Sequence, residues 1–136
     1  PCFAREGDDR DIAVAGFPFD GALSFASTTF GNISALEGVD GEAWMQRLDL
    51  TTGDSEAGGP VLDASGAVLG MVLPGTAGQR MLPDEVTLAL RSDSLLEAMA
   101  SAGVPLQTAA SVGTTLNRDQ LARLGADIAV RVSCWN

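Results

Sequence analysis

The chain has 136 residues, enough for one domain with a core, and 46% of them are hydrophobic, although no apolar run reaches the ~18 residues of a membrane-spanning helix. Eighteen Asp and Glu residues outnumber eight Lys and Arg residues, for a net charge of −10, so we expect no nucleic-acid partner, which would require clustered basic residues. There is no histidine, which excludes a self-contained Ser-His-Asp or Cys-His catalytic site.

Hydrophobic periodicity predicts a series of short strands in the first two thirds of the chain. The predicted strands cover residues 12–17, 25–36, 44–50, 61–62, 67–73 and 86–90. Gly31 lies inside the second of these, which predicts a bulge or a sharp bend at that point. Trp44 and Trp135 are predicted to be core or lid residues.

Two helices and a final strand are predicted in the last third. Ser92 or Asp93 is suited to N-cap a helix that runs to about residue 102 and stops at Gly103. Asn117 precedes a short amphipathic helix over residues 119–124, and the alternating run 128–135 predicts a closing strand.

These elements predict a mainly β fold, a small barrel of about six strands with a C-terminal helical extension and a final strand. An α+β sandwich is the alternative, because periodicity alone does not separate the two. The expected division is a linker over residues 1–11, a barrel over residues 12–91 and a helix-containing extension over residues 92–136.

Cys2 and Cys134 are the only cysteines, too few for a structural zinc site, so neither a metal nor a cofactor is expected. A disulfide between them would tie the two ends together and stabilise the fold by roughly 4–5 kcal/mol in the chain-entropy model. Such a bond implies an exported, periplasmic or secreted protein. The alternatives are two free thiols, or pairing of Cys2 with a cysteine outside the chain.

Residues 53–72, with the sequence GDSEAGGPVLDASGAVLGMV, form the stretch around which the chain is organised. A Gly-rich loop leads into two apolar runs joined by a turn at residues 63–66, which predicts a β-hairpin. Asp63 fits this turn, and Gly66 supplies a residue able to take a positive φ.

This stretch resembles the nucleophile loop and following hairpin of trypsin-like serine peptidases, especially the HtrA-type branch, where the pattern is Gly-Asp/Asn-Ser-Gly-Gly-Pro. Further blocks resemble that family in the same order, so that the resemblance covers about residues 12–102. These blocks are Val14 to Pro18, Thr28 to Leu36, Met45 to Leu50, Gly66 to Val72 and Val86 to Leu90. The tail, ending in residues 132–135, is more weakly similar to trypsin-like proteins of alphaproteobacteria.

The resemblance implies the second barrel of a trypsin-like double-barrel fold. The catalytic His and Asp of that family come from the first barrel, so the expected partner is an N-terminal barrel carrying them, from the same precursor or from another chain. Because the chain begins at Pro1, we expect it to be a processed or truncated piece. Leu73, Pro74 and Gly75 are the expected substrate-binding wall, and the expected ligand is an extended peptide or a protein.

The loop departs from the family pattern at the position that matters most. Aligned on Gly58 and Gly59, the nucleophile serine corresponds to Ala57, which has no hydroxyl group and cannot attack a carbonyl. Ser55 stands where the family has an oxyanion-hole glycine, and Glu56 stands at the residue before the nucleophile. Ser55, Glu56, Gly58 and Gly59 are therefore the candidate oxyanion-loop residues.

Three interpretations of Ala57 remain open. Either alanine is native and the barrel is a non-catalytic pseudopeptidase that binds or scaffolds proteins, or a native serine was replaced to disarm a serine endopeptidase. In the third interpretation Ser55 is the nucleophile of a shifted loop, with a turn-capping hydroxyl as its alternative role. In each case the chain alone is expected to hydrolyse no peptide.

Overall fold

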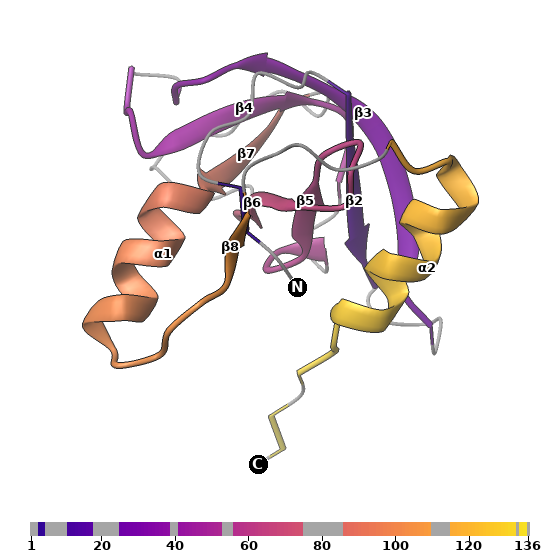
Figure 1. The fold of residues 1–136 in the computed structure, drawn as a ribbon. Coiled ribbons are helices and arrows are strands. Elements are labelled where there is room, and N and C mark those ends of the chain that lie inside the picture. The colour runs from indigo at the N-terminus through magenta and orange to yellow at the C-terminus, as the bar shows by residue number, and fades with distance from the viewer. Residues whose placement is uncertain are drawn as a thin grey trace.

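The computed structural model describes residues 3–4, 11–17, 25–38, 41–52, 56–74, 86–109, 115–132 and 134–135. Strands come first along the chain and helices mostly last (Figure 1). In chain order the elements are β1 (Phe3–Ala4), β2 (Asp11–Gly16), β3 (Ser27–Ala35), β4 (Met45–Asp49), β5 (Pro60–Leu62), β6 (Val68–Val72), β7 (Val86–Arg91), α1 (Ser92–Ser101), β8 (Thr108–Ala109) and α2 (Arg118–Ile128).

Within the described residues, six antiparallel strands form a closed barrel in the order β2-β3-β4-β7-β6-β5. The barrel closes where β5 pairs with β2, with Ala13 opposite Leu62 and Val14 opposite Val61. This closure confirms the predicted six-stranded barrel over the sandwich. The two short strands β1 and β8 pair in parallel with each other, and β1 also pairs with β6.

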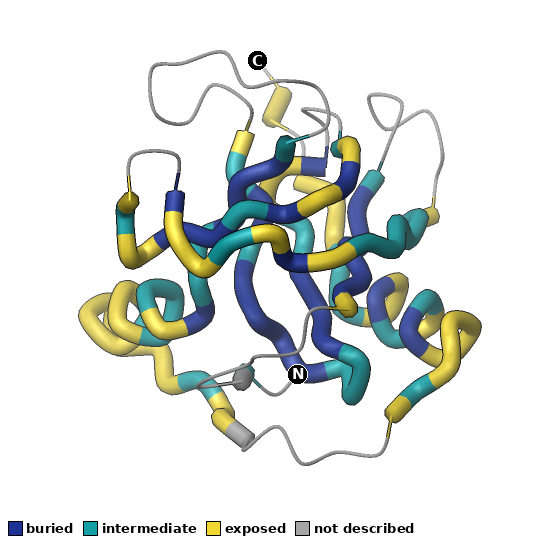
Figure 2. Tube along the Cα trace, turned by 90° about the horizontal axis from the view of Figure 1, so that it is seen from above, coloured by how far each residue is buried: buried dark blue, intermediate teal, exposed yellow. Residues whose placement is uncertain are grey.

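The barrel interior is filled by aliphatic side chains that alternate along the strands, as the period of a strand requires. Figure 2 shows the buried residues gathered along the central strands. This inner cluster consists of Ile12, Val14, Ile33, Leu48, Leu50, Val61, Ala67, Leu69, Val72 and Ala89. On β2, Ile12 and Val14 face this interior, whereas Ala13 belongs to a second cluster outside the barrel. Because both faces of β2 are covered, its sequence is a continuous apolar run.

Helix α2 covers the outer face of β2. It begins with a capping box, in which the Asn117 side chain accepts a hydrogen bond from the Gln120 N–H (2.8 Å) and the Gln120 side chain accepts one from the Asn117 N–H (3.0 Å). Leu121 is buried in the second cluster with Ala13 and Leu62. The helix is longer than predicted, because its apolar stripe continues past residue 124 to Ile128.

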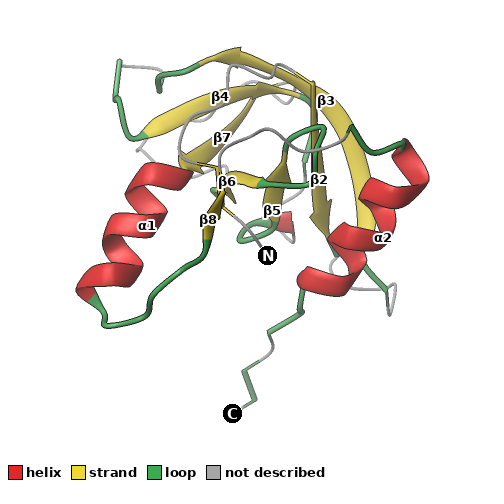
Figure 3. Ribbon diagram, in the orientation of Figure 1, coloured by secondary structure: helices red, strands yellow, loops and turns green. Residues whose placement is uncertain are grey.

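Helix α1 follows β7 directly and lies on the opposite side of the barrel from α2 (Figure 3). Its length agrees with the predicted span, but its N-cap is Arg91, which makes no side-chain capping bond, rather than Ser92 or Asp93. Ser92 is instead the buried first residue of the helix. Among the described residues, no helix is long and apolar enough to cross a membrane.

Several predicted details are wrong. The final strand over residues 128–135 does not form, because α2 continues through Ile128 and residues 129–132 have no strand partner. Trp44 and Trp135 are 47% and 91% exposed, so neither is a core residue. The irregularity of β3 lies between Ile33 and Ala35, where its register with β4 shifts, and not at Gly31.

The turn between β5 and β6 is built on one buried carboxylate. Asp63 is 1% exposed, and its Oδ1 accepts hydrogen bonds from the Ser65 N–H (2.8 Å), the Ser65 hydroxyl (2.7 Å) and the Ala67 N–H (2.9 Å). Gly66 has φ of +86°, as the predicted turn required. The carboxylate thus accepts hydrogen bonds from backbone N–H groups of the turn that have no partner in the β5–β6 hydrogen-bond ladder.

We expect Asp63→Ala to lower the free energy of unfolding by about 2–4 kcal/mol, because it leaves the buried Ala67 N–H without an acceptor. Asp63→Asn, which retains one acceptor oxygen, should cost less. Urea unfolding followed by circular dichroism measures both, and Asp49→Ala, at an exposed position on β4, is the control. Equal stability of the Asp63→Ala and Asp49→Ala variants would contradict this role.

Candidate functional site

The loop that the sequence singled out lies between β4 and β5, and residues 56–59 of it are described. Glu56 is buried, with 6% of its surface exposed, whereas Ala57 and Gly58 are exposed. The alternative nucleophile Ser55 lies outside the described residues.

Backbone hydrogen bonds hold this loop against β6. The Gly58 N–H donates to the Val72 carbonyl (2.8 Å), and the Val72 N–H donates back to the Gly59 carbonyl (2.9 Å). The Gly59 N–H donates to the Glu56 carbonyl (3.0 Å), closing a tight turn around Ala57. Gly58 takes φ of +86°, a conformation that other residues adopt only with strain.

The end of β2 lies against this loop at very short range. A side chain on Gly59 would collide with the Ala15 carbonyl oxygen, so the loop backbone and β2 touch directly. A methyl group on Gly16 would lie 3.1 Å from Cγ of Glu56. From the other side, a methyl group on Gly125 of α2 would lie 2.7 Å from Cβ of Ala15.

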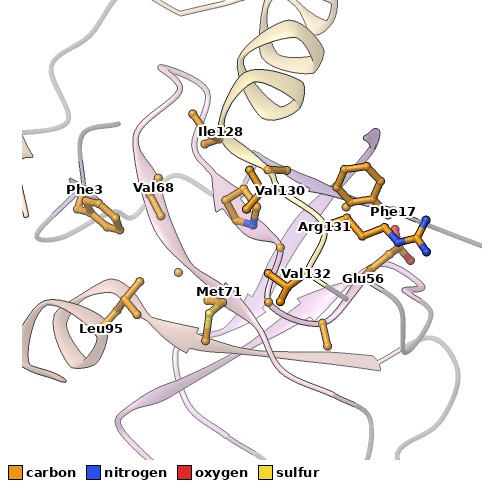
Figure 4. Close-up of a pocket in the computed structure, with 17 residues that line it drawn as sticks. Phe3, Phe17, Glu56, Val68, Met71, Leu95, Ile128, Val130, Arg131 and Val132 are labelled. Atoms are coloured by element: carbon orange, nitrogen blue, oxygen red, sulfur yellow. The ribbon is translucent and has the colours of Figure 1, made fainter. Parts of the chain in front are cut away.

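A cavity of about 650 Å³ opens beside Ala57 (Figure 4). The loop, the end of β2 and strand β6 form three of its sides, and residues 129–132 after α2 form another. Most of the side chains that line it are apolar, among them Phe17, Val68 and Met71. Glu56, Ala57, Gly58 and Gly59, four of the candidate loop residues, thus all line this one cavity.

The predicted substrate-binding wall lies elsewhere. Leu73 and Pro74 follow β6 but are not among the residues that line this cavity, and Gly75 lies outside the described residues. The Leu73 N–H donates to the Leu88 carbonyl (2.9 Å), and proline has no N–H. An extended peptide laid along these two residues could therefore use only their carbonyl groups.

Sequence reasoning missed several residues at the cavity. Phe17 was counted as the end of a strand, Met71 as an interior strand residue, and residues 129–132 as part of a closing strand. The single arginine in the apolar run of residues 128–132 is the one local sign that this segment has another role.

Among the described residues there is no group of three or more His, Cys, Asp and Glu side chains that could hold a metal ion. Cys134 is an exposed free thiol, and Cys2 lies outside the described residues, so their predicted pairing stays a prediction.

We expect Gly59→Ala to destabilise the barrel by about 3 kcal/mol, because the added methyl group meets the Ala15 carbonyl oxygen and the neighbouring backbone. Gly58→Ala is the matched control, since a methyl group there meets nothing within 4 Å and only the strain of positive φ, about 1–2 kcal/mol, remains. Urea unfolding measures both variants. The reverse order of stability would show that the loop does not pack on β2.

Comparisons with known proteins agree with this architecture. No family model matches the chain. The uncharacterized protein y4bJ of Sinorhizobium fredii (strain NBRC 101917 / NGR234) is 30% identical over an alignment of 132 residues, and the match covers 92% of this chain and 21% of that protein. The chain therefore spans about a fifth of the length of this curated relative.

Two proteases illustrate the structural likeness. The inactive form of Rv3671c from M. tuberculosis H37Rv, in a serine-to-alanine mutant, has a TM-score of 0.58 and 25% identity over 75% of this chain and 52% of that chain. The HtrA-type protease AlgW, in a serine-to-alanine variant with a tripeptide, has a TM-score of 0.54 and 23% identity over 74% of this chain and 34% of that chain. The chain thus has the fold of one β-barrel of the HtrA-type, trypsin-like serine proteases.

Proposed function

We propose that the chain is the C-terminal, nucleophile-loop barrel of a trypsin-like serine endopeptidase, catalytically inactive as it stands. The observation that carries this proposal is the position of Ala57. It is exposed beside the cavity, on a turn whose glycines are hydrogen-bonded to β6 and packed on β2. That is a suitable place for a nucleophile, and alanine offers none.

This barrel lacks two groups that peptide hydrolysis requires, a nucleophile at residue 57 and a histidine to act as general base. Attack on a peptide carbonyl needs a hydroxyl or thiol, and the methyl group of Ala57 supplies neither. It also needs a general base, and the 136 residues contain no histidine. We propose that an N-terminal barrel, from the same precursor or another chain, would supply the His and Asp in the exported protein.

A binding function is the second candidate, and the cavity favours it. A space of about 650 Å³ lined mostly by apolar side chains, directly beside an exposed loop, is suited to hold the side chain of an extended peptide or protein. If alanine is native at residue 57, the barrel is a pseudopeptidase with this binding role. If the natural residue is serine, the same barrel belongs to an active peptidase.

We expect neither this chain nor its Ala57→Ser variant to form an adduct with a fluorophosphonate, because a serine hydroxyl without a general base is a weak nucleophile. Intact-mass spectrometry after labelling measures this, with trypsin as the positive control. An adduct on Ser55 of the unaltered chain would overturn the proposal and assign the nucleophile to a shifted loop.

A positive test replaces the missing nucleophile with a thiol. We expect the Ala57→Cys variant to react faster with N-acetyl-Ala-Ala-Ala-Val chloromethyl ketone than with chloroacetone, because a bound peptide holds the reactive carbon near residue 57. Cys134 is exposed and, in protein reduced before labelling, serves as the reference thiol in the same molecule.

Peptide mapping by mass spectrometry gives the rate at each thiol. For each thiol we take the rate with the peptide chloromethyl ketone divided by the rate with chloroacetone. This ratio should be about tenfold or more higher at residue 57 than at Cys134, because a bound peptide holds its reactive carbon near residue 57. Equal ratios at the two thiols would mean that no peptide binds beside residue 57, and would overturn the assignment of this site.

A further inference from the structure

Glu56 is an unusual residue for its position. Its side chain is 94% buried, as the 6% exposed fraction indicates, and it packs against Gly16 at the end of β2. It immediately precedes Ala57, and its own carbonyl accepts the hydrogen bond from Gly59 that closes the turn. A buried carboxylate is costly unless a cation or hydrogen-bond donors compensate its charge.

Arg131 lines the same cavity as Glu56 and carries the positive charge that could compensate the buried carboxylate. Among the described residues that line the cavity, Glu56 and Arg131 are the two that carry charge. Figure 4 shows their side chains pointing toward one another next to Phe17. Each of the two residues has an interaction partner in the structure.

The path of the chain explains why Arg131 reaches the loop. Helix α2 is pressed onto Ala15 through Gly125, and it ends where the Ala129 N–H donates to the Gly125 carbonyl (2.9 Å). Ala129 itself is extended, with φ of −82° and ψ of 130°. This extended segment runs along the cavity, and Val130, Arg131 and Val132 all line it although all three are exposed to solvent.

We propose that Arg131 is a positioning residue, whose guanidinium pairs with the Glu56 carboxylate and thereby holds the turn around residue 57 in place. The C-terminal segment after α2 is then a clamp on this loop. The inference rests on the proposed function only in naming residue 57 as the nucleophile position.

Hydrogen exchange of backbone amides tests the clamp directly. The Gly58 and Gly59 amides report on the turn, and the Gly66 amide, which donates to the Asp63 carbonyl (3.0 Å), reports on the hairpin at the other end of β5. In Arg131→Gln we expect Gly58 and Gly59 to exchange about tenfold faster, with Gly66 unchanged, because only the local opening becomes easier.

Three further variants separate charge pairing from general damage. Arg131→Lys retains the positive charge and should restore most of the protection at Gly58 and Gly59. Arg123→Gln removes an exposed arginine from α2 and should change nothing. Glu56→Gln should release the turn as Arg131→Gln does, and the double variant should be no worse than either single one, as expected for two partners in one interaction.

Unchanged exchange at Gly58 and Gly59 in Arg131→Gln would overturn the proposal. So would equal acceleration at Gly66, which indicates global destabilisation, or an Arg131→Lys variant that behaves like Arg131→Gln. The experiment contains no peptide and no nucleophile. A negative hydrogen-exchange result would therefore leave the affinity labelling at residue 57 unaffected. If the labelling fails but the exchange pattern is as expected, only the proposed function is contradicted.

Discussion

The structure depends on the close approach of three backbones at Ala15 and Gly16. The nucleophile-position loop lies on the Ala15 carbonyl through Gly59, helix α2 lies on the Ala15 methyl group through Gly125, and Glu56 packs against Gly16. Each contact requires that one side lack a side chain, because protein interiors leave no room for an extra methyl group at these distances. A loop, a strand and a helix far apart in sequence are thereby placed relative to one another.

Under the proposed function, the geometry of a peptidase site is separate from its chemistry. The turn around Ala57 retains its two glycines and its hydrogen bonds to Val72. Those features position a residue at the cavity whether or not that residue can react. Catalysis requires in addition a nucleophile and a base, and this chain contains neither at the expected place. Under the proposed function, binding of a peptide needs only the cavity and the surrounding backbone, so it does not depend on a serine at residue 57.

The strands of the barrel were predictable from sequence because each is short, apolar and bounded by turn residues. The hairpin after the loop followed from Gly66, which does take positive φ, and the clustering of Glu56, Ala57, Gly58 and Gly59 followed from their adjacency. These features depend on residues that are close together in the sequence, so hydrophobic periodicity and turn residues are enough to predict them.

The remaining parts of the site depend on tertiary structure. The alternation of residues 128–135 is typical of a strand, yet Ile128 joins the helix because it packs on the outer cluster. Residues 129–132 form no strand in the part of the chain that the structure describes. Nothing local indicates that Arg131 faces Glu56, since the two are brought together only by the packing of Gly125 on Ala15. Trp44 has the position of a half-buried strand residue but precedes β4 and is exposed.

The double coverage of β2 has a consequence for how the chain folds. Strand β5, which pairs with β2 through Val61 and Leu62, comes much later in the sequence than β2. Leu121, which covers the outer face of β2, comes later again. Contacts between such distant segments form slowly, because the intervening chain loses conformational entropy before the contacts stabilise the fold. A chain growing from its N-terminus therefore carries an apolar, incompletely paired strand until α2 has been made. Folding of this barrel is therefore completed only after α2 has been synthesised.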